Sequence, residues 1–164
     1  MKGFIALLEK IYLGSIIVIG VAWVVNVPQY FGLSLISAEW IGAFLSVGIA
    51  AAFLRHPYRK KAGALELFLG FVALGCWLWM SLNYSDWIID LVGQTPQKFV
   101  PGIFAILLLM EAMRKSAGLP ITILVWVLIA YGLFGWVFPQ PFQSEQLPVS
   151  RLVMYIYADT NGIP

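Results

Sequence analysis

The amino-acid sequence predicts an all-α integral membrane protein, a bundle of about five transmembrane helices. Three observations support this fold class: 61% of the residues are hydrophobic, only 11% are charged, and the mean hydropathy is +0.87. Soluble domains carry charge on about a quarter of their residues. Four or five spans of about 20 residues with short connections use up the whole chain of 164 residues, so we expect no separate soluble domain.

Apolar runs of membrane-spanning length define a transmembrane scaffold over residues 1–138. Between the third and fourth runs, residues 83–98 mix carboxylates with apolar side chains, which predicts a short interfacial helix or turn. Residues 139–164 predict a linker and then an amphipathic helix in the membrane interface. The expected transmembrane helices cover residues 11–27, 38–54, 65–82, 99–116 and 120–138.

The first span is expected to be retained with the N-terminus inside. A cleavable signal peptide is the alternative, but its apolar run of about 17 residues exceeds the usual 7 to 15, and no small-residue cleavage site follows Val27. The segment 99–116 crosses fully only if Arg114 and Lys115 extend their charged ends to the interface. A re-entrant hairpin, with four spans, is the alternative. Five spans leave only Lys98 and Arg151 outside, so the positive-inside rule favours five.

The fourth and fifth spans meet at a charged stretch, residues 111–120, which we call the clasp. Glu111 precedes Arg114 by three residues and Lys115 by four, the spacing at which side chains on one helix face meet. Gly118 and Pro120 then predict a helix end followed at once by a helix start. We therefore expect a tight helical hairpin with a locally paired charge cluster.

Other residues mark possible contact positions. Gly42, Ser46 and Ala50 are four apart and form a small-residue stripe, which predicts either a subunit interface or internal helix packing. The carboxylates of Glu39, Glu66 and Glu111 lie near the ends of their spans. They are candidates either for a role in ion coupling or for a packing or topological role. The basic stretch 55–61 is expected to face the cytoplasm and to contact anionic membrane lipids.

Several functional classes are disfavoured by the sequence. It contains none of the common nucleotide-binding, zinc-binding or hydrolase motifs, so we expect no enzyme and no cofactor. The net charge is only +2, and the basic residues are scattered among connections, which argues against a nucleic-acid partner. The single Cys76 lies in an apolar run and is expected to be buried and inert.

The last 65 or so residues resemble the N-terminal membrane region of tripartite ATP-independent periplasmic (TRAP) transporters, of the branch served by TAXI-type binding proteins. The resemblance rests on four stretches in the family's order, and the first of them shares residues 111–115 with the clasp. These stretches are residues 107–115, 118–121, 131–135 and 151–163.

This resemblance implies a role as the small Q-type membrane component, separate or as the N-terminal region of a fused permease. In that family it would be a fixed scaffold beside a large M-type component, which carries the sodium and substrate sites, in a bacterial or archaeal inner membrane. A periplasmic TAXI-type protein would deliver organic acids, and residues 139–164 would lead into or dock on the large component. The alternative function is a self-assembling small membrane protein, either an exporter or a non-transporting adaptor.

Overall fold

The computed structural model describes residues 2–32, 35–59, 62–88 and 95–159, and every regular element in these ranges is a helix. Five elements, α1, α3, α4, α5 and α6 extended by η2, are long and apolar enough to cross a membrane. The expected all-α membrane bundle is therefore confirmed. In chain order the elements are α1 (Lys2–Val24), α2 (Val27–Tyr30), α3 (Ser37–Arg55), α4 (Ala64–Trp87), α5 (Pro96–Ser116), α6 (Leu119–Phe134), the 3-10 helix η2 (Gly135–Val137) and α7 (Val149–Ala158).

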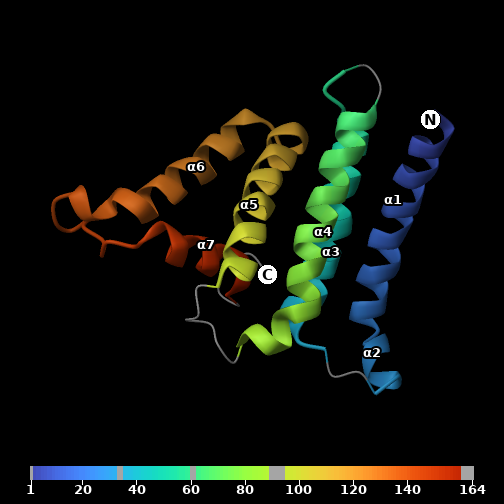
Figure 1. The fold of residues 1–164 in the computed structure, drawn as a ribbon, viewed down its shortest axis with the longest axis horizontal. Coiled ribbons are helices and arrows are strands. Elements are labelled where there is room, and N and C mark those ends of the chain that lie inside the picture. The colour runs from blue at the N-terminus through green and yellow to red at the C-terminus, as the bar shows by residue number, and fades with distance from the viewer. Residues whose placement is uncertain (1, 33–34, 60–61, 89–94, 160–164) are drawn as a thin grey trace.

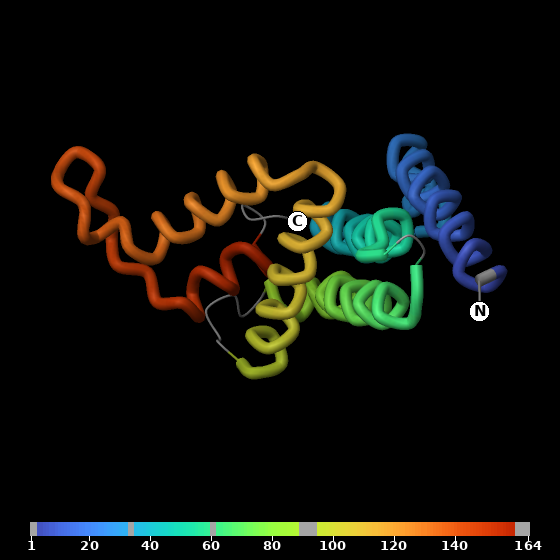
Figure 2. The backbone as a smooth tube through the Cα atoms, turned by 90° about the horizontal axis from the view of Figure 1, so that it is seen from above, coloured from blue at the N-terminus to red at the C-terminus, as the bar shows by residue number. Residues whose placement is uncertain are grey.

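The centre of the bundle is the antiparallel pair α3 and α4, with α5 packed against both (Figures 1 and 2). The two helices approach closely because small residues line their contact. A side chain on Gly70 would meet the backbone oxygen of Ala50 at 3.4 Å, and one on Gly42 would collide with Met80. Close backbone approach through small residues is the usual way in which membrane helices associate.

Helix α1 lies beside α3, on the side away from α5 (Figure 2). The indole rings of Trp23 and Trp40 stack with their centroids 5.4 Å apart, and Gly20 lies opposite Phe44. Most other apolar side chains of α1 are exposed, including Ile17 and Val18. An apolar helix with this exposure is stable only when lipid or another protein covers it.

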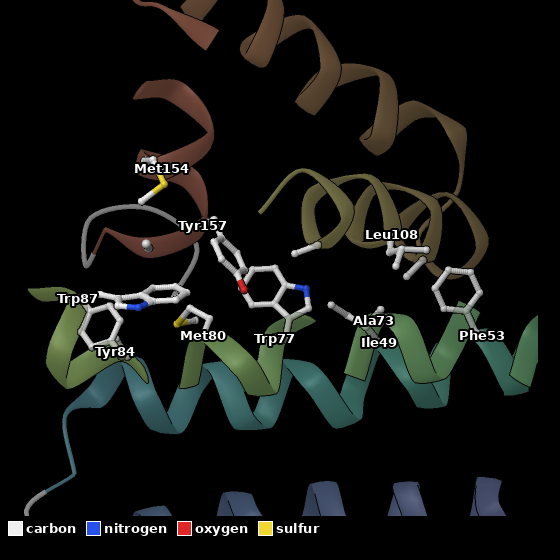
Figure 3. Packing of buried hydrophobic residues seen from close by; sticks show 14 residues of the cluster. Ile49, Phe53, Ala73, Trp77, Met80, Tyr84, Trp87, Leu108, Met154 and Tyr157 are labelled. Atoms are coloured by element: carbon white, nitrogen blue, oxygen red, sulfur yellow. The ribbon is translucent and has the colours of Figure 1, made fainter. Parts of the chain in front are cut away.

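Helix α7 packs its apolar face against α5 and α4 of the same chain. Tyr157 is fully buried, and its ring meets Trp77 edge to face at 5.5 Å and Trp87 at 6.0 Å (Figure 3). Val153 and Tyr157 lie over Gly102 of α5, where a Cβ atom would come within 3.0 Å of both side chains. The predicted amphipathic helix thus exists, and its apolar face is buried inside the bundle.

Several helices differ from the predicted bounds. Helix α1 covers Lys2–Val24 instead of 11–27, so it begins nine residues earlier than predicted and ends three residues earlier. Helix α4 continues to Trp87, five residues past the expected end, because Tyr84 and Trp87 are buried in the core. Helix α5 begins at Pro96 rather than at residue 99, since proline is well suited to a first helical turn. These two helices therefore take up both ends of the expected interfacial segment 83–98, while residues 89–94 lie outside the described part of the chain. With 21 residues, α5 is about 32 Å long, enough to cross a hydrocarbon core of about 30 Å.

Candidate functional site

Two of the three candidate carboxylates cap the helices that carry them. Glu39 is the third residue of α3, and its Oε2 accepts a hydrogen bond of 3.0 Å from the backbone N–H of Ile36. Glu66 is the third residue of α4, and its Oε2 accepts one of 2.7 Å from Gly63. Each carboxylate accepts a hydrogen bond from a backbone N–H that would be unpaired at the helix start. Its negative charge also interacts favourably with the positive end of the helix dipole.

Glu66 also holds the loop between α3 and α4. Its Oε1 accepts a hydrogen bond of 3.0 Å from the backbone N–H of Tyr58, and the whole residue is only 4% exposed. The two oxygens thus bind the loop at Tyr58 and at Gly63, on either side of the basic residues. A buried carboxylate is tolerated here because these donors compensate for the water that it loses.

The third carboxylate, Glu111, lies at the centre of a cluster at the C-terminal end of α5. Arg114 donates two hydrogen bonds to it, from Nε to Oε2 at 2.7 Å and from a terminal nitrogen to Oε1 at 2.6 Å. The hydroxyl of Tyr58 donates a third, of 2.6 Å, to Oε1. The predicted pairing of Glu111 with Arg114 is confirmed, and its forked geometry is the strongest type of ion pair.

Lys115 takes a different partner from the one that its spacing predicts. Its Nζ donates a hydrogen bond of 2.8 Å to the carbonyl oxygen of His56 and lies 3.3 Å from the centre of the Tyr58 ring. It also lies 5.1 Å from the centre of the Phe53 ring. Contact with the ring face gives the ammonium group a favourable cation–π interaction. Lys115 therefore binds α5 to the α3–α4 loop instead of pairing with Glu111 on its own helix.

Tyr58 is the residue that connects these groups, through its backbone to Glu66 and through its hydroxyl to Glu111. Burial and the hydrogen bond to Glu111 raise the pKa of Tyr58 to about 12, because the neutral hydroxyl is the form that donates. Sequence reasoning placed Tyr58 only within a basic loop and missed this role. The available signal was one aromatic hydroxyl among cationic residues, which does not reveal a contact with a helix 53 residues away.

The clasp closes the hairpin as predicted. Helix α5 ends at Ser116, Gly118 has a φ of +92° that favours glycine, and α6 begins at Leu119 with Pro120 in its first turn. The N–H groups of Ala117 and Gly118 both donate to the carbonyl oxygen of Met113, which satisfies an acceptor at the helix end.

The small-residue stripe is covered by α4. Gly42 faces Met80 and Ser81, while Ser46 and Ala50 are buried. The hydroxyl of Ser46 donates to the carbonyl oxygen of Ala43 at 2.7 Å. Of the two interpretations of the stripe, the structure therefore supports internal packing.

The clustered residues hold helices together, and their chemistry is that of caps and ion pairs. Among the residues that the structure describes, no group of three His, Cys, Asp or Glu side chains could hold a metal ion. Cys76 is half-buried, and its carbonyl oxygen accepts a hydrogen bond from the hydroxyl of Tyr157. The fold and this cluster define a multi-pass helical membrane protein. Comparison with protein-family models, curated proteins and solved structures finds no match.

Proposed function

We propose that this chain is the small scaffold subunit, or the N-terminal part, of a sodium-coupled TRAP-type transporter that imports organic acids. In this proposal a large M-type membrane component carries the sodium and substrate sites, and a periplasmic TAXI-type binding protein delivers the substrate. The proposal rests on the resemblance in residues 107–163 together with the structural use of the candidate carboxylates.

The observation that best supports the scaffold role is the hydrogen bonding of Glu39, Glu66 and Glu111. Each carboxylate accepts hydrogen bonds from its own chain at a helix end, two as helix caps and one in the clasp. A carboxylate that couples ion movement must exchange partners during the cycle, whereas these groups are needed to hold the helix ends. A fixed scaffold is the role that fits such contacts.

The surface of the bundle fits a subunit that lies beside another membrane protein. Helices α1 and α6 are on opposite sides of the α3–α5 core, and both expose apolar side chains over most of their length (Figure 2). The N-terminal end of α1, the α3–α4 loop and the clasp lie at one end of the bundle (Figure 1). These are the positions of most basic residues, so the positive-inside rule supports a cytoplasmic location for this end.

Reconstituted uptake tests the proposal. The chain alone, a candidate large M-type component, and both together are placed in vesicles with an inward sodium gradient, the binding protein and an organic acid. We expect uptake only when both membrane components are present. Robust sodium-dependent uptake by these 164 residues alone would overturn the scaffold role.

Cross-linking in native membranes separates the proposal from self-assembly. One-to-one pairing with a multispanning protein supports the scaffold, whereas a homodimer without a large partner supports the alternative. In the assembled complex, Glu111→Ala should lower the yield while substrate affinity stays nearly unchanged, because Glu111 accepts hydrogen bonds from Tyr58 and Arg114 of its own chain. Normal assembly with a large loss of affinity or sodium coupling would instead place Glu111 in the transport mechanism.

A further inference from the structure

An apolar groove lies between α5, α6 and α7, with a volume of about 490 Å³. Helix α6 diverges from α5 after the clasp, and α7 closes the far side of the gap between them (Figures 1 and 2). Six of the side chains that line it are Met110 and Met113 of α5, Leu128 and Ile129 of α6, and Leu152 and Ile156 of α7.

Helix α5, and α6 extended by η2, are each long and apolar enough to span a bilayer, so we expect the groove between them to lie at the depth of the membrane hydrocarbon. Its volume is within the range of about 300–1,000 Å³ that ligand sites occupy. Left empty, such a groove would deprive its lining side chains of dispersion contacts on one side. In a bilayer the molecules at hand to restore those contacts are lipid acyl chains.

Positive charge gathers at the clasp end of the groove. Met113 lines the groove and is followed directly by Arg114. The hydrogen bonds from Tyr58 to Glu111 and from Lys115 to His56 hold the stretch that carries Arg55 and Arg59 at this end of α5. Among the described residues of the clasp and of the stretch from Arg55 to Glu66, there are four cationic side chains and two carboxylates, and both carboxylates are already hydrogen-bonded. The four cations are Arg55, Arg59, Arg114 and Lys115. This excess of positive charge suits the phosphate of a lipid headgroup.

We propose that the groove binds an anionic phospholipid, with one acyl chain between α5, α6 and α7 and the headgroup at the clasp. The lipid fills the space that divergence of α6 leaves and helps to fix the angle of that helix. The site belongs to the chain itself, so it does not depend on the proposed transporter role.

Matched leucines on α6 test the acyl-chain site. Leu128 lines the groove, whereas Leu124, one turn earlier, does not, and both are 59% exposed. The full-length chain, Leu128→Trp and Leu124→Trp are purified in mild detergent with phosphatidylglycerol, and retained lipid is measured by native mass spectrometry. We expect Leu128→Trp to lose most of the retained lipid, because the indole occupies the groove, and Leu124→Trp to retain it.

Equal retention by the two variants, equal loss from both, or no lipid on the unchanged chain would overturn the proposal. So would a second protein chain that is retained in place of lipid and released by Leu128→Trp. If Leu128→Trp is not folded, as shown by the loss of a cooperative unfolding transition, a second pair of variants replaces the first. This pair is Val125→Trp in the groove and Val127→Trp outside it.

The headgroup is tested by competition between phosphatidylglycerol and phosphatidylcholine with matched acyl chains. Arg55 and Arg59 are exposed, so changing both to Gln leaves the packing of the core in place. We expect the unchanged chain to prefer phosphatidylglycerol and the double variant to lose that preference while still retaining lipid. No preference in the unchanged chain, or an unaltered preference in the variant, would show that the basic end does not bind the headgroup.

Discussion

The hydroxyl of Tyr58 donates a hydrogen bond of 2.6 Å to Oε1 of Glu111, although 53 residues separate them along the chain. This contact joins the loop after α3 to the last turns of α5. The same tyrosine also binds Glu66 of α4 through its backbone N–H. Three helices are thus connected at one end of the bundle through a single side chain and its backbone.

Removal of this hydroxyl should weaken the end of the bundle. We expect Tyr58→Phe to lower the free energy of unfolding by about 1 kcal/mol, the usual net value of one hydrogen bond. Thermal unfolding in detergent measures the change, and Tyr30→Phe is the control because Tyr30 is exposed on the short α2. Equal stability of both variants would show that the contact contributes nothing.

The stabilisation by Tyr58 should depend on pH in the alkaline range. Its pKa is raised from 10.0 to about 12 in the folded chain, so the fold favours the neutral hydroxyl. The contribution is therefore complete below pH 10 and is lost as the pH rises through 12. The difference in unfolding temperature between the unchanged chain and Tyr58→Phe should shrink over this interval. A difference that stays constant from pH 9 to 12 would refute the assignment.

Loss of the clasp carboxylate should have a larger effect than loss of the tyrosine hydroxyl. Glu111→Ala removes the acceptor for Tyr58 and the partner of Arg114 together, so we expect lower thermal stability and a lower yield of folded protein. Changing Arg114 and Lys115 together to Gln should reproduce the defect. In the Glu111→Ala background, Tyr58→Phe should have almost no further effect, because its acceptor is already gone. Additive effects would contradict the shared contact.

Crowding at Gly102 should displace α7. A Cβ atom there would lie 3.0 Å from side-chain atoms of Val153 and Tyr157, so Gly102→Leu should destabilise the chain by about 1–3 kcal/mol. Gly75→Leu is the control, since a Cβ on Gly75 meets nothing within 4 Å. Limited proteolysis in the linker before α7 should be faster only in Gly102→Leu. Equal cleavage of both variants would show that α7 does not depend on this contact.

The aromatic contacts of Tyr157 should matter more than its hydroxyl. Tyr157→Ala removes a fully buried ring that packs on Trp77 and Trp87, with an expected cost of about 3–5 kcal/mol. Tyr157→Phe removes only the hydrogen bond to Cys76, so its cost should be about 1 kcal/mol. Chemical denaturation of both variants gives the comparison. Similar costs would mean that ring packing contributes little.

The class of fold, the order of the spans and the hairpin at Gly118 follow from the sequence by itself. Long apolar runs determine where helices must form, because backbone groups in lipid need partners within the chain. The pairing of Glu111 with Arg114 was also predictable, since three residues along one helix determine that distance.

Only the tertiary structure decided which groups meet across long separations. Lys115 binds the loop at His56, Tyr58 reaches Glu111, and Tyr157 enters the core beneath α5, because the packing of α3, α4 and α5 brings these segments together. The groove exists for the same reason, since it depends on the angle at which α6 leaves the clasp. The apolar runs of the sequence predict where membrane helices form, but they do not predict which neighbouring helix covers each face.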